Sequence, residues 1–195
     1  MGLKFASIHV YDLNNKMMAD QFSQVYLDQL HDPEKEYQKR IRMMQALSGK
    51  SVDSQMQSWI QSVVAAEREE VEFVESGDWH SAYDRNYTFE TIEDAVASLS
   101  RVVALPVFYA TVYDDDILLF GICIDGEFVT KHSMGSYFAL KEYGVEKRRV
   151  DVHVFCEKLD LQNKVLAEKL CKQRSIFKAI ETLEKLMGIQ MFLRY

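Results

Sequence analysis

The spacing of apolar residues divides the chain into three blocks. Between residues 17 and 67, apolar side chains recur at helical spacing, which predicts amphipathic helices. Between residues 69 and 155 they fall in short runs rich in β-branched and aromatic residues, which is typical of strands. The helical spacing returns between residues 158 and 188. We therefore expect a single α+β domain over residues 1–195, with a helical block, a sheet-rich block and a C-terminal helical pair.

The strongest helix boundaries lie in the first block. Asp32 is a natural N-cap, Pro33 suits the first helical position, and Gly49 suits the left-handed residue that ends a helix. Asp53 then marks the start of a further helix. The pattern predicts two consecutive helices joined by a short connection near residue 50.

The clearest strands lie in the middle block. Asp125-Gly126 separates two β-rich runs, which is a strong hairpin signal, and three aspartates separate the preceding pair of runs. Further strands are expected at residues 3–11, 71–76, 79–83 and 149–155. The predicted fold is α+β: a mixed β-sheet that contains a three-stranded antiparallel meander over about residues 106–131, flanked by about six amphipathic helices.

Net charge narrows the choice of partner. The formal net charge of −7 disfavours general nucleic-acid binding, which needs Lys and Arg to replace phosphate counterions. The charge is uneven, because residues 140–195 hold 12 basic and 8 acidic side chains and the rest of the chain is strongly acidic. This asymmetry favours another protein with a basic surface as partner, or head-to-tail packing of copies, and leaves homo-oligomerisation undecided.

Cysteine usage and hydropathy bear on the compartment. The cysteines are three in number and widely spaced, which favours free thiols in a reducing compartment. No apolar run approaches the roughly 20 residues of a membrane helix, and the N-terminal residues lack the apolar centre of a secretory signal. We expect a cytoplasmic protein without a membrane partner.

Tyr-Asp pairs end three of the β-rich runs, at Tyr11-Asp12, Tyr83-Asp84 and Tyr113-Asp114. If the strands at 79–83 and 107–113 are parallel neighbours joined by the helix between them, their aspartates lie at the same carboxyl edge of the sheet. A parallel first strand would bring Asp12 to that edge as well. Ligands commonly bind at this edge in open α/β sheets.

Carboxylates gathered in this way are ligands for Mg²⁺ or Ca²⁺, and two such ions can drive phosphoryl chemistry. The candidate metal ligands are therefore Asp12, Asp84, Asp114 and Asp116, and the candidate catalytic residues are Asp84, Asp114 and Asp116. The competing interpretation is structural: aspartate and asparagine are common turn formers, and an acidic hairpin tip protects a sheet edge from aggregation.

Other chemical signatures are weak. The histidines show no metal-binding spacing, but His9 and His153 occupy similar contexts in two expected strands, which suggests an acid–base pair across the sheet. Half-buried structural imidazoles are the alternative. No glycine-rich phosphate loop is present. We predict no cofactor, with Mg²⁺ or Ca²⁺ required only by the metal-site hypothesis.

The composition supports a full apolar core without a catalytic fingerprint, since 48% of the residues are hydrophobic. This combination favours a non-enzymatic protein-binding module, and analogy with other acidic single-domain proteins suggests inhibitor- or immunity-like capping of a basic target. The alternative is a divalent-metal-assisted hydrolase or phosphoesterase with its acidic site at the carboxyl edge of the sheet.

Overall fold

The computed structural model describes residues 4–14 and 16–192. Its helices and strands follow one another in the order β1 (Phe5–Tyr11), α1 (Ala19–Leu30), α2 (Pro33–Ser48), α3 (Ser54–Glu69), β2 (Glu72–Ser76), β3 (Trp79–Tyr83), α4 (Ile92–Val103), β4 (Val107–Tyr113), β5 (Ile117–Ile124), β6 (Glu127–Gly135), α5 (Tyr137–Glu142), α6 (Val152–Lys158), α7 (Lys164–Leu170) and α8 (Ile176–Met187). The first predicted strand is confirmed from Phe5 onward, and residue 3 of that prediction lies outside the described residues.

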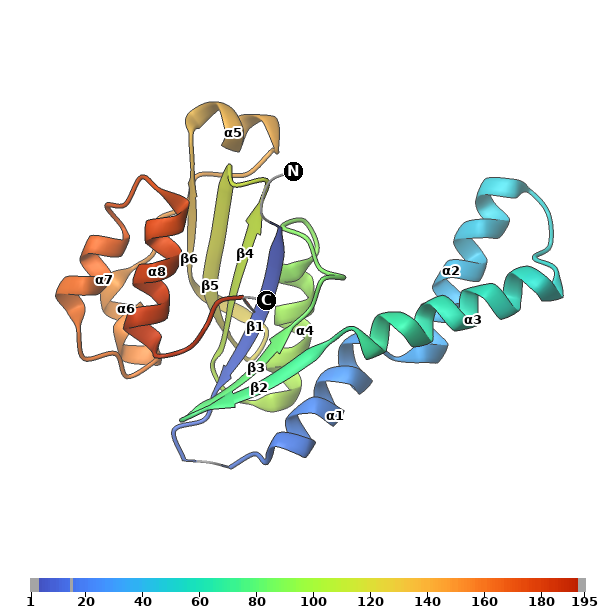
Figure 1. Ribbon diagram of the computed structural model, residues 1–195, viewed down its shortest axis with the longest axis horizontal. Helices are drawn as coiled ribbons and strands as arrows, with labels where there is room; N and C mark the ends of the chain where they lie inside the picture. Colours follow the sequence, from blue (N-terminus) through green and yellow to red (C-terminus); the bar gives the residue numbers. More distant parts are fainter. Residues whose placement is uncertain (1–3, 15, 193–195) are drawn as a thin grey trace.

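Within the described residues the strands form one six-stranded sheet in the order β2-β3-β1-β4-β5-β6 (Figure 1). The α+β class and the β4-β5-β6 meander are confirmed. The expectation of a mixed sheet is wrong, because each of the described strand pairs is antiparallel. Strands β3 and β4 do run in the same direction, but β1 lies between them and is antiparallel to both. Helix α4 therefore crosses over β1 instead of joining adjacent strands.

A three-residue turn, 114–116, joins β4 to β5, and a two-residue turn, 125–126, joins β5 to β6. Asp114 and Asp115 have φ of 51° and 61°, and Asp125 and Gly126 have φ of 51° and 83°. Positive φ at both central residues is the backbone of the turn that best matches the right-handed twist of a hairpin. The three-aspartate segment is thus a tight hairpin turn, with Asp116 N donating to the Tyr113 carbonyl over 3.1 Å.

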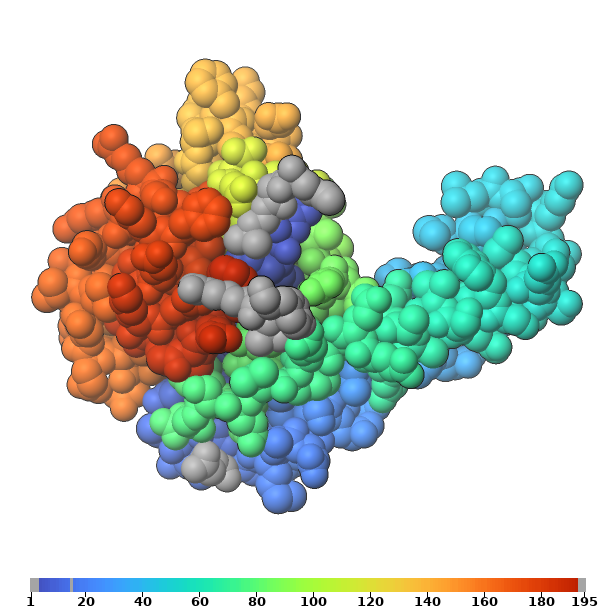
Figure 2. Space-filling view, in the orientation of Figure 1, coloured from blue at the N-terminus to red at the C-terminus, as the bar shows by residue number. Residues whose placement is uncertain are grey.

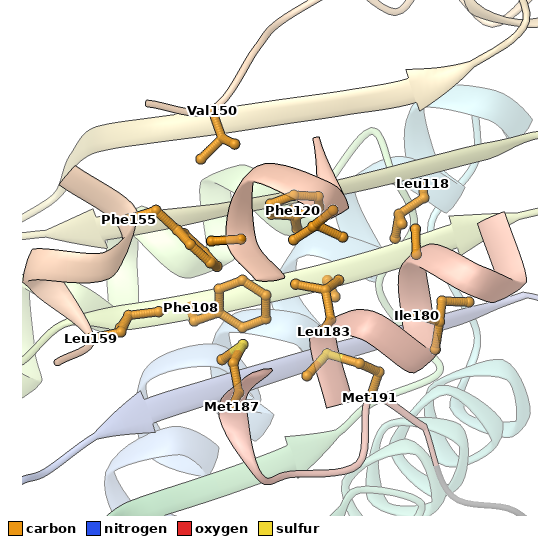
Figure 3. Close-up of a cluster of buried hydrophobic side chains, with 14 of the residues drawn as sticks. Phe108, Leu118, Phe120, Val150, Phe155, Leu159, Ile180, Leu183, Met187 and Met191 are labelled. Atoms are coloured by element: carbon orange, nitrogen blue, oxygen red, sulfur yellow. The ribbon is translucent and has the colours of Figure 1, made fainter. Parts of the chain in front are cut away.

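Helices cover both faces of the sheet. On one face, Phe108 and Phe120 of the sheet pack against Phe155 of α6 and Leu183 of α8 (Figure 3). On the other face, Ile8 and other sheet residues pack against α1 and α4. Both sides of β1, β4 and β5 are consequently buried, which explains why these strands read as continuous apolar runs rather than as alternating ones.

The strand expected at 149–155 is wrong, because α6 begins at Val152. The Asp151 carboxylate caps this helix by accepting from the backbone N of His153 and Val154. Residues just before it lie beside β6, where Arg148 N donates to the Ser133 hydroxyl over 2.6 Å. The alternating apolar pattern arose from an extended segment followed by a capped helix, and a short apolar run does not distinguish these from one strand.

Helices α2 and α3, with the connection 49–53, form an antiparallel hairpin that we call the arm. The arm projects from the rest of the molecule (Figures 1 and 2). All residues of α2 are described, and none of them is fully buried. Helix α3 buries Ile60 and Val64. The arm therefore contributes little to the central core and stands out from it.

Gly126 provides a test of the second hairpin turn. We expect Gly126→Ala to lower the free energy of unfolding by about 2 kcal/mol, because φ of 83° is strained for alanine and the new Cβ would overlap the Arg101 side chain. Gly77→Ala is the matched control, since φ is also positive and nothing lies within 4 Å of the added Cβ. It should cost about 1 kcal/mol. Equal losses in urea unfolding would refute a role for the Arg101 contact.

Candidate functional site

A buried carboxylate lies where the arm meets the sheet. Asp84 directly follows β3, and its side chain is 1% exposed. One carboxylate oxygen accepts from the Tyr26 hydroxyl over 3.0 Å and from His31 Nε2 over 2.6 Å. The other oxygen accepts from the backbone N of Asn86 over 2.9 Å. The charge is therefore met by donors from three segments of the chain, which is the condition under which a buried carboxylate is tolerated.

Further hydrogen bonds around this carboxylate attach the arm to the body. Arg68 of α3 donates to the His31 carbonyl over 3.3 Å, and the Tyr87 hydroxyl donates to the Leu30 carbonyl over 3.3 Å. Asn86 Nδ2 donates to the Glu67 carbonyl of α3 over 3.2 Å. The first bond joins α3 to the residue that follows α1. The second joins α1 to the segment after β3, and the third joins α3 to that segment. We call this set the Asp84 cluster.

The tyrosines of the cluster are held in their protonated form. Burial raises the pKa of Tyr26, and the nearby Asp84 charge raises it further. Burial likewise raises the pKa of Tyr87, with Asp84 again adding to the effect. Both hydroxyls consequently remain hydrogen-bond donors at any physiological pH, as attachment to acceptors requires.

A polar cavity of about 210 Å³ lies beside the cluster. Its walls include His31, Tyr87, Arg40 and Glu67, and the last two form an ion pair with N–O distances of 2.6 and 2.8 Å. The lining includes one hydroxyl side chain, that of Thr91. The His31–Asp84 pair has the geometry of an acid–base dyad, and it joins the residue that follows α1 to the segment after β3.

A line of half-buried and exposed side chains runs outward from this cavity along the arm. In α2, residues 36, 40, 43 and 47 are spaced by four, three and four, so they lie along one side of the helix. In α3, residues 59, 63 and 67 are spaced by four and do the same. Glu36, Arg40 and Glu67 line the same cavity, so the two lines share one side of the arm.

The outer part of this side is apolar. Leu47 is 78% exposed, Trp59 is 57% exposed and Met43 is 56% exposed, and Val63 lies between them and the cavity. We call Met43, Leu47, Trp59 and Val63 the apolar face of the arm. Large apolar groups gathered on one side of a projecting element are typical of a protein-interaction surface.

The structure separates the aspartates that the sequence grouped. Because β1 runs opposite to β3 and β4, Asp12 lies at the other edge of the sheet from Asp84 and Asp114. Asp84 and Asp114 share an edge, but β1 intervenes, which spaces their strands by roughly 10 Å. The premise of neighbouring parallel strands was therefore wrong. Among the residues described, no group of three or more His, Cys, Asp or Glu side chains is placed to hold a metal ion.

Each of the remaining candidate aspartates has a local role. Asp12 is buried and accepts from Met17 N over 2.7 Å. Burial disfavours its charge, but backbone N–H groups of the following loop outweigh burial and hold the pKa of Asp12 below its usual value. Asp114 pairs with Lys4 at an N–O distance of 3.4 Å. Asp116 is the last residue of the same turn and immediately precedes β5. These roles match the turn-forming interpretation of the Tyr-Asp pairs.

The histidines predicted to pair across the sheet do not meet. His9 is buried between the hydroxyls of Ser81 and Ser7, at 2.8 and 2.9 Å. His153 lies on α6 and is largely exposed. Burial lowers the pKa of His9 to about 3, and burial together with Arg149 lowers the pKa of His132 to about 4. Both buried imidazoles are therefore neutral near pH 7.

Comparison with known proteins finds no family model that matches the chain, no matching curated protein and no matching solved structure. Within the described residues, no helix has both the length and the apolar character needed to cross a membrane. The residues of the Asp84 cluster were largely missed by sequence reasoning. Tyr26 and His31 lie more than fifty positions from Asp84, and no local spacing links them to it.

Replacing the central carboxylate tests the cluster. Asp84→Asn keeps the shape but turns an amide donor toward the donors on Tyr26 or His31, so we expect the free energy of unfolding to fall by about 2–4 kcal/mol. Asp114→Asn is the control, because that carboxylate is partly exposed in a turn, and it should change stability by less than about 0.5 kcal/mol. Urea unfolding of both variants measures the difference. Similar losses would contradict the assigned role of Asp84.

The two buried histidines predict that the free energy of unfolding decreases in acid. An unfolded histidine has a pKa near 6.5, so between about pH 6.5 and 4 the unfolded chain binds protons that folded His9 and His132 do not. The contribution of these two neutral imidazoles to the free energy of unfolding is therefore fully present above this window, and it is lost as the pH is lowered through it. His132→Gln should reduce the slope by about 1.4 kcal/mol per pH unit.

His153→Gln supplies the control for the substitution itself, because this side chain is exposed on the surface of α6. The free energy of unfolding of each variant is measured between pH 6.5 and 4.5. A slope for His132→Gln that equals that of the parent protein would show that His132 is protonated in the folded state.

Proposed function

We propose that this protein is a non-enzymatic protein-binding module that presents the apolar face of its arm to a partner protein. The observation that carries the proposal is helix α2, whose sixteen residues are all described and none of them fully buried. A helix of this length gains most of its stability from packing an apolar stripe. Helix α3 covers one stripe of α2, and a protein partner would cover the flank that carries Met43 and Leu47.

The exposed groups are of the kind that dominate protein interfaces. Tryptophan and methionine are enriched in interface cores, and burying one large apolar side chain contributes about 1.5–3 kcal/mol. The apolar face combines both residue types with Leu47 on a single side of the arm. Its neighbours toward the body are charged, which resembles the polar rim of an interface.

The Asp84 cluster supports this function by holding the arm in place before binding. A surface that is already ordered loses less conformational entropy when it docks, so more of the contact energy appears as affinity. Both helices of the arm are attached at its base. The start of α2 is held by the bond between His31 and Asp84, and the end of α3 is held by the bonds of Arg68 to His31 and of Asn86 to Glu67. The arrangement suits a preformed interaction surface better than a mobile lid.

Charge at the base of the arm favours a partner with basic groups. Residues 32–38 and 62–70, which we call the foot, hold six acidic and two basic side chains. A partner that carries an apolar patch beside basic residues would match both parts of the arm, as in inhibitor- or immunity-like capping. We place this interaction in the cytoplasm, which the three free cysteines support.

Site-specific photo-crosslinking in the native host tests the proposal. A photoreactive residue at position 47 should yield one protein adduct, because that side chain lies on the apolar face. The matched control is position 165 on α7, where Val165 is 79% exposed and Leu47 is 78% exposed. Equal exposure makes random collisions equal at the two positions. Equal labelling at both, or no adduct at 47, would contradict the proposal.

A further inference from the structure

We propose that the base of the arm holds a binding site for a small organic cation with an apolar body, such as an arylalkyl ammonium. The site is a cavity of about 620 Å³ between α1, α2 and α3, close to where the arm leaves the body (Figure 1). Pockets that take up whole small molecules measure about 300–1,000 Å³. The cavity is therefore large enough to hold a complete ligand.

Apolar groups from all three helices form the walls of this cavity. Leu27 belongs to α1, Pro33 and Tyr37 belong to the start of α2, and Val64 and Ala65 belong to α3. Val64 is buried, and Leu27 and Tyr37 are half-buried. An apolar ligand body that displaces water from such walls gains hydrophobic free energy, and a tyrosine ring also attracts cations.

The cations near the cavity are already paired. Arg68 is the cation among the described lining residues, and it pairs with Asp28 at an N–O distance of 3.3 Å and donates to the His31 carbonyl. Lys35, the other basic side chain of the foot, pairs with Asp32 at 3.2 Å. Neither cation is left to neutralise an acidic group of the cavity wall.

Two acidic side chains of the wall have no cationic partner among the described residues. Glu69 forms no hydrogen bond or ion pair there, and the Glu34 carboxylate accepts from the neutral amide of Gln38 over 2.8 Å. Lys39, one turn farther along α2, pairs with Glu36. A ligand with a positive charge would supply the missing partner, whereas an anion would meet two negative charges.

This cavity and the apolar face lie on different sides of the arm. On α3 the cavity residue Ala65 follows Val63 of the apolar face by two positions, which is about half a turn of a helix. A ligand in the cavity would leave the apolar face open to a protein partner. The ligand site therefore goes beyond the proposed function, and neither requires the other.

Titration of the purified full chain with 3-phenylpropylammonium, followed by two-dimensional heteronuclear NMR, is the first test. We expect a dissociation constant of about 0.5–5 mM for a ligand of about ten non-hydrogen atoms. The resonances that shift should belong to residues at the cavity wall, such as Glu34, Tyr37 and Glu69. 3-Phenylpropanoate has a similar body and the opposite charge, and it should bind at least about 5-fold more weakly.

Three results of this titration would overturn the proposal. The first is no binding of the ammonium up to about 20 mM. The second is a set of shifts centred on another surface. The third is an affinity for the carboxylate within about 2-fold of that for the ammonium, because the two acidic side chains would then not select the ligand.

Filling the cavity tests its location. Ala65→Phe places a ring in the cavity and should weaken binding of the ammonium by at least about 5-fold. Ala66→Phe is the matched control, because Ala66 is the next residue of the same helix, is also exposed and is not among the described lining residues. It should bind like the parent, and circular dichroism checks that both variants keep their helices. Equal affinities of the two variants would overturn the assignment of the site.

Removing one charge tests the recognition of the cation. Glu69→Gln should weaken binding of 3-phenylpropylammonium by about 2–5-fold and leave the affinity for the uncharged 3-phenylpropanol unchanged. Glu70→Gln removes the same charge from the adjacent residue, which is outside the described lining, and should change neither affinity. Equal effects of the two variants, or an equal loss of affinity for the alcohol, would overturn the role of Glu69 as the partner of the cation.

Discussion

The arm depends on the buried carboxylate of Asp84. A charge in this position is unfavourable unless donors satisfy it, and here the Tyr26 hydroxyl, the His31 ring and the Asn86 backbone do so. These donors belong to α1, to the residue between α1 and α2, and to the segment after β3. Meeting the charge therefore fixes the end of α1, and with it the start of α2, against the segment after β3, and Asn86 of that segment also bonds the end of α3. A rotation of α2 away from the body would therefore cost the Asp84 carboxylate its His31 donor.

The body and the arm are stabilised in different ways. The sheet is covered on both faces, and residues such as Phe108, Phe120 and Phe155 lie in a closely packed core. The arm has two fully buried side chains among the described residues of α2 and α3, and it exposes Leu47 and Trp59. These exposed side chains lie outside the core of the body, which supports the proposed role of the arm in binding.

Much of the fold was predictable because its signals are local. Asp125-Gly126 gave the β5–β6 hairpin, and Asp32, Pro33 and Gly49 gave the limits of α2. Local signals also caused the errors. The alternating run at 149–155 resembles a strand, but Asp151 caps a helix there. The parallel arrangement of Asp84 and Asp114 failed because β1, distant in sequence, occupies the position between their strands.

By itself, the sequence determined where most helices and strands begin and end, and that the chain can bury a full core. Capping, turn formation and apolar spacing act over a few residues, so they can be read from the chain directly. Only the tertiary structure decided which polar residues meet. His31 reaches Asp84 across 53 positions, and whether the stripes on α2 and α3 share one side depends on how the two helices pack. Long-range pairing is set by the packing of the whole chain, and no local spacing records it.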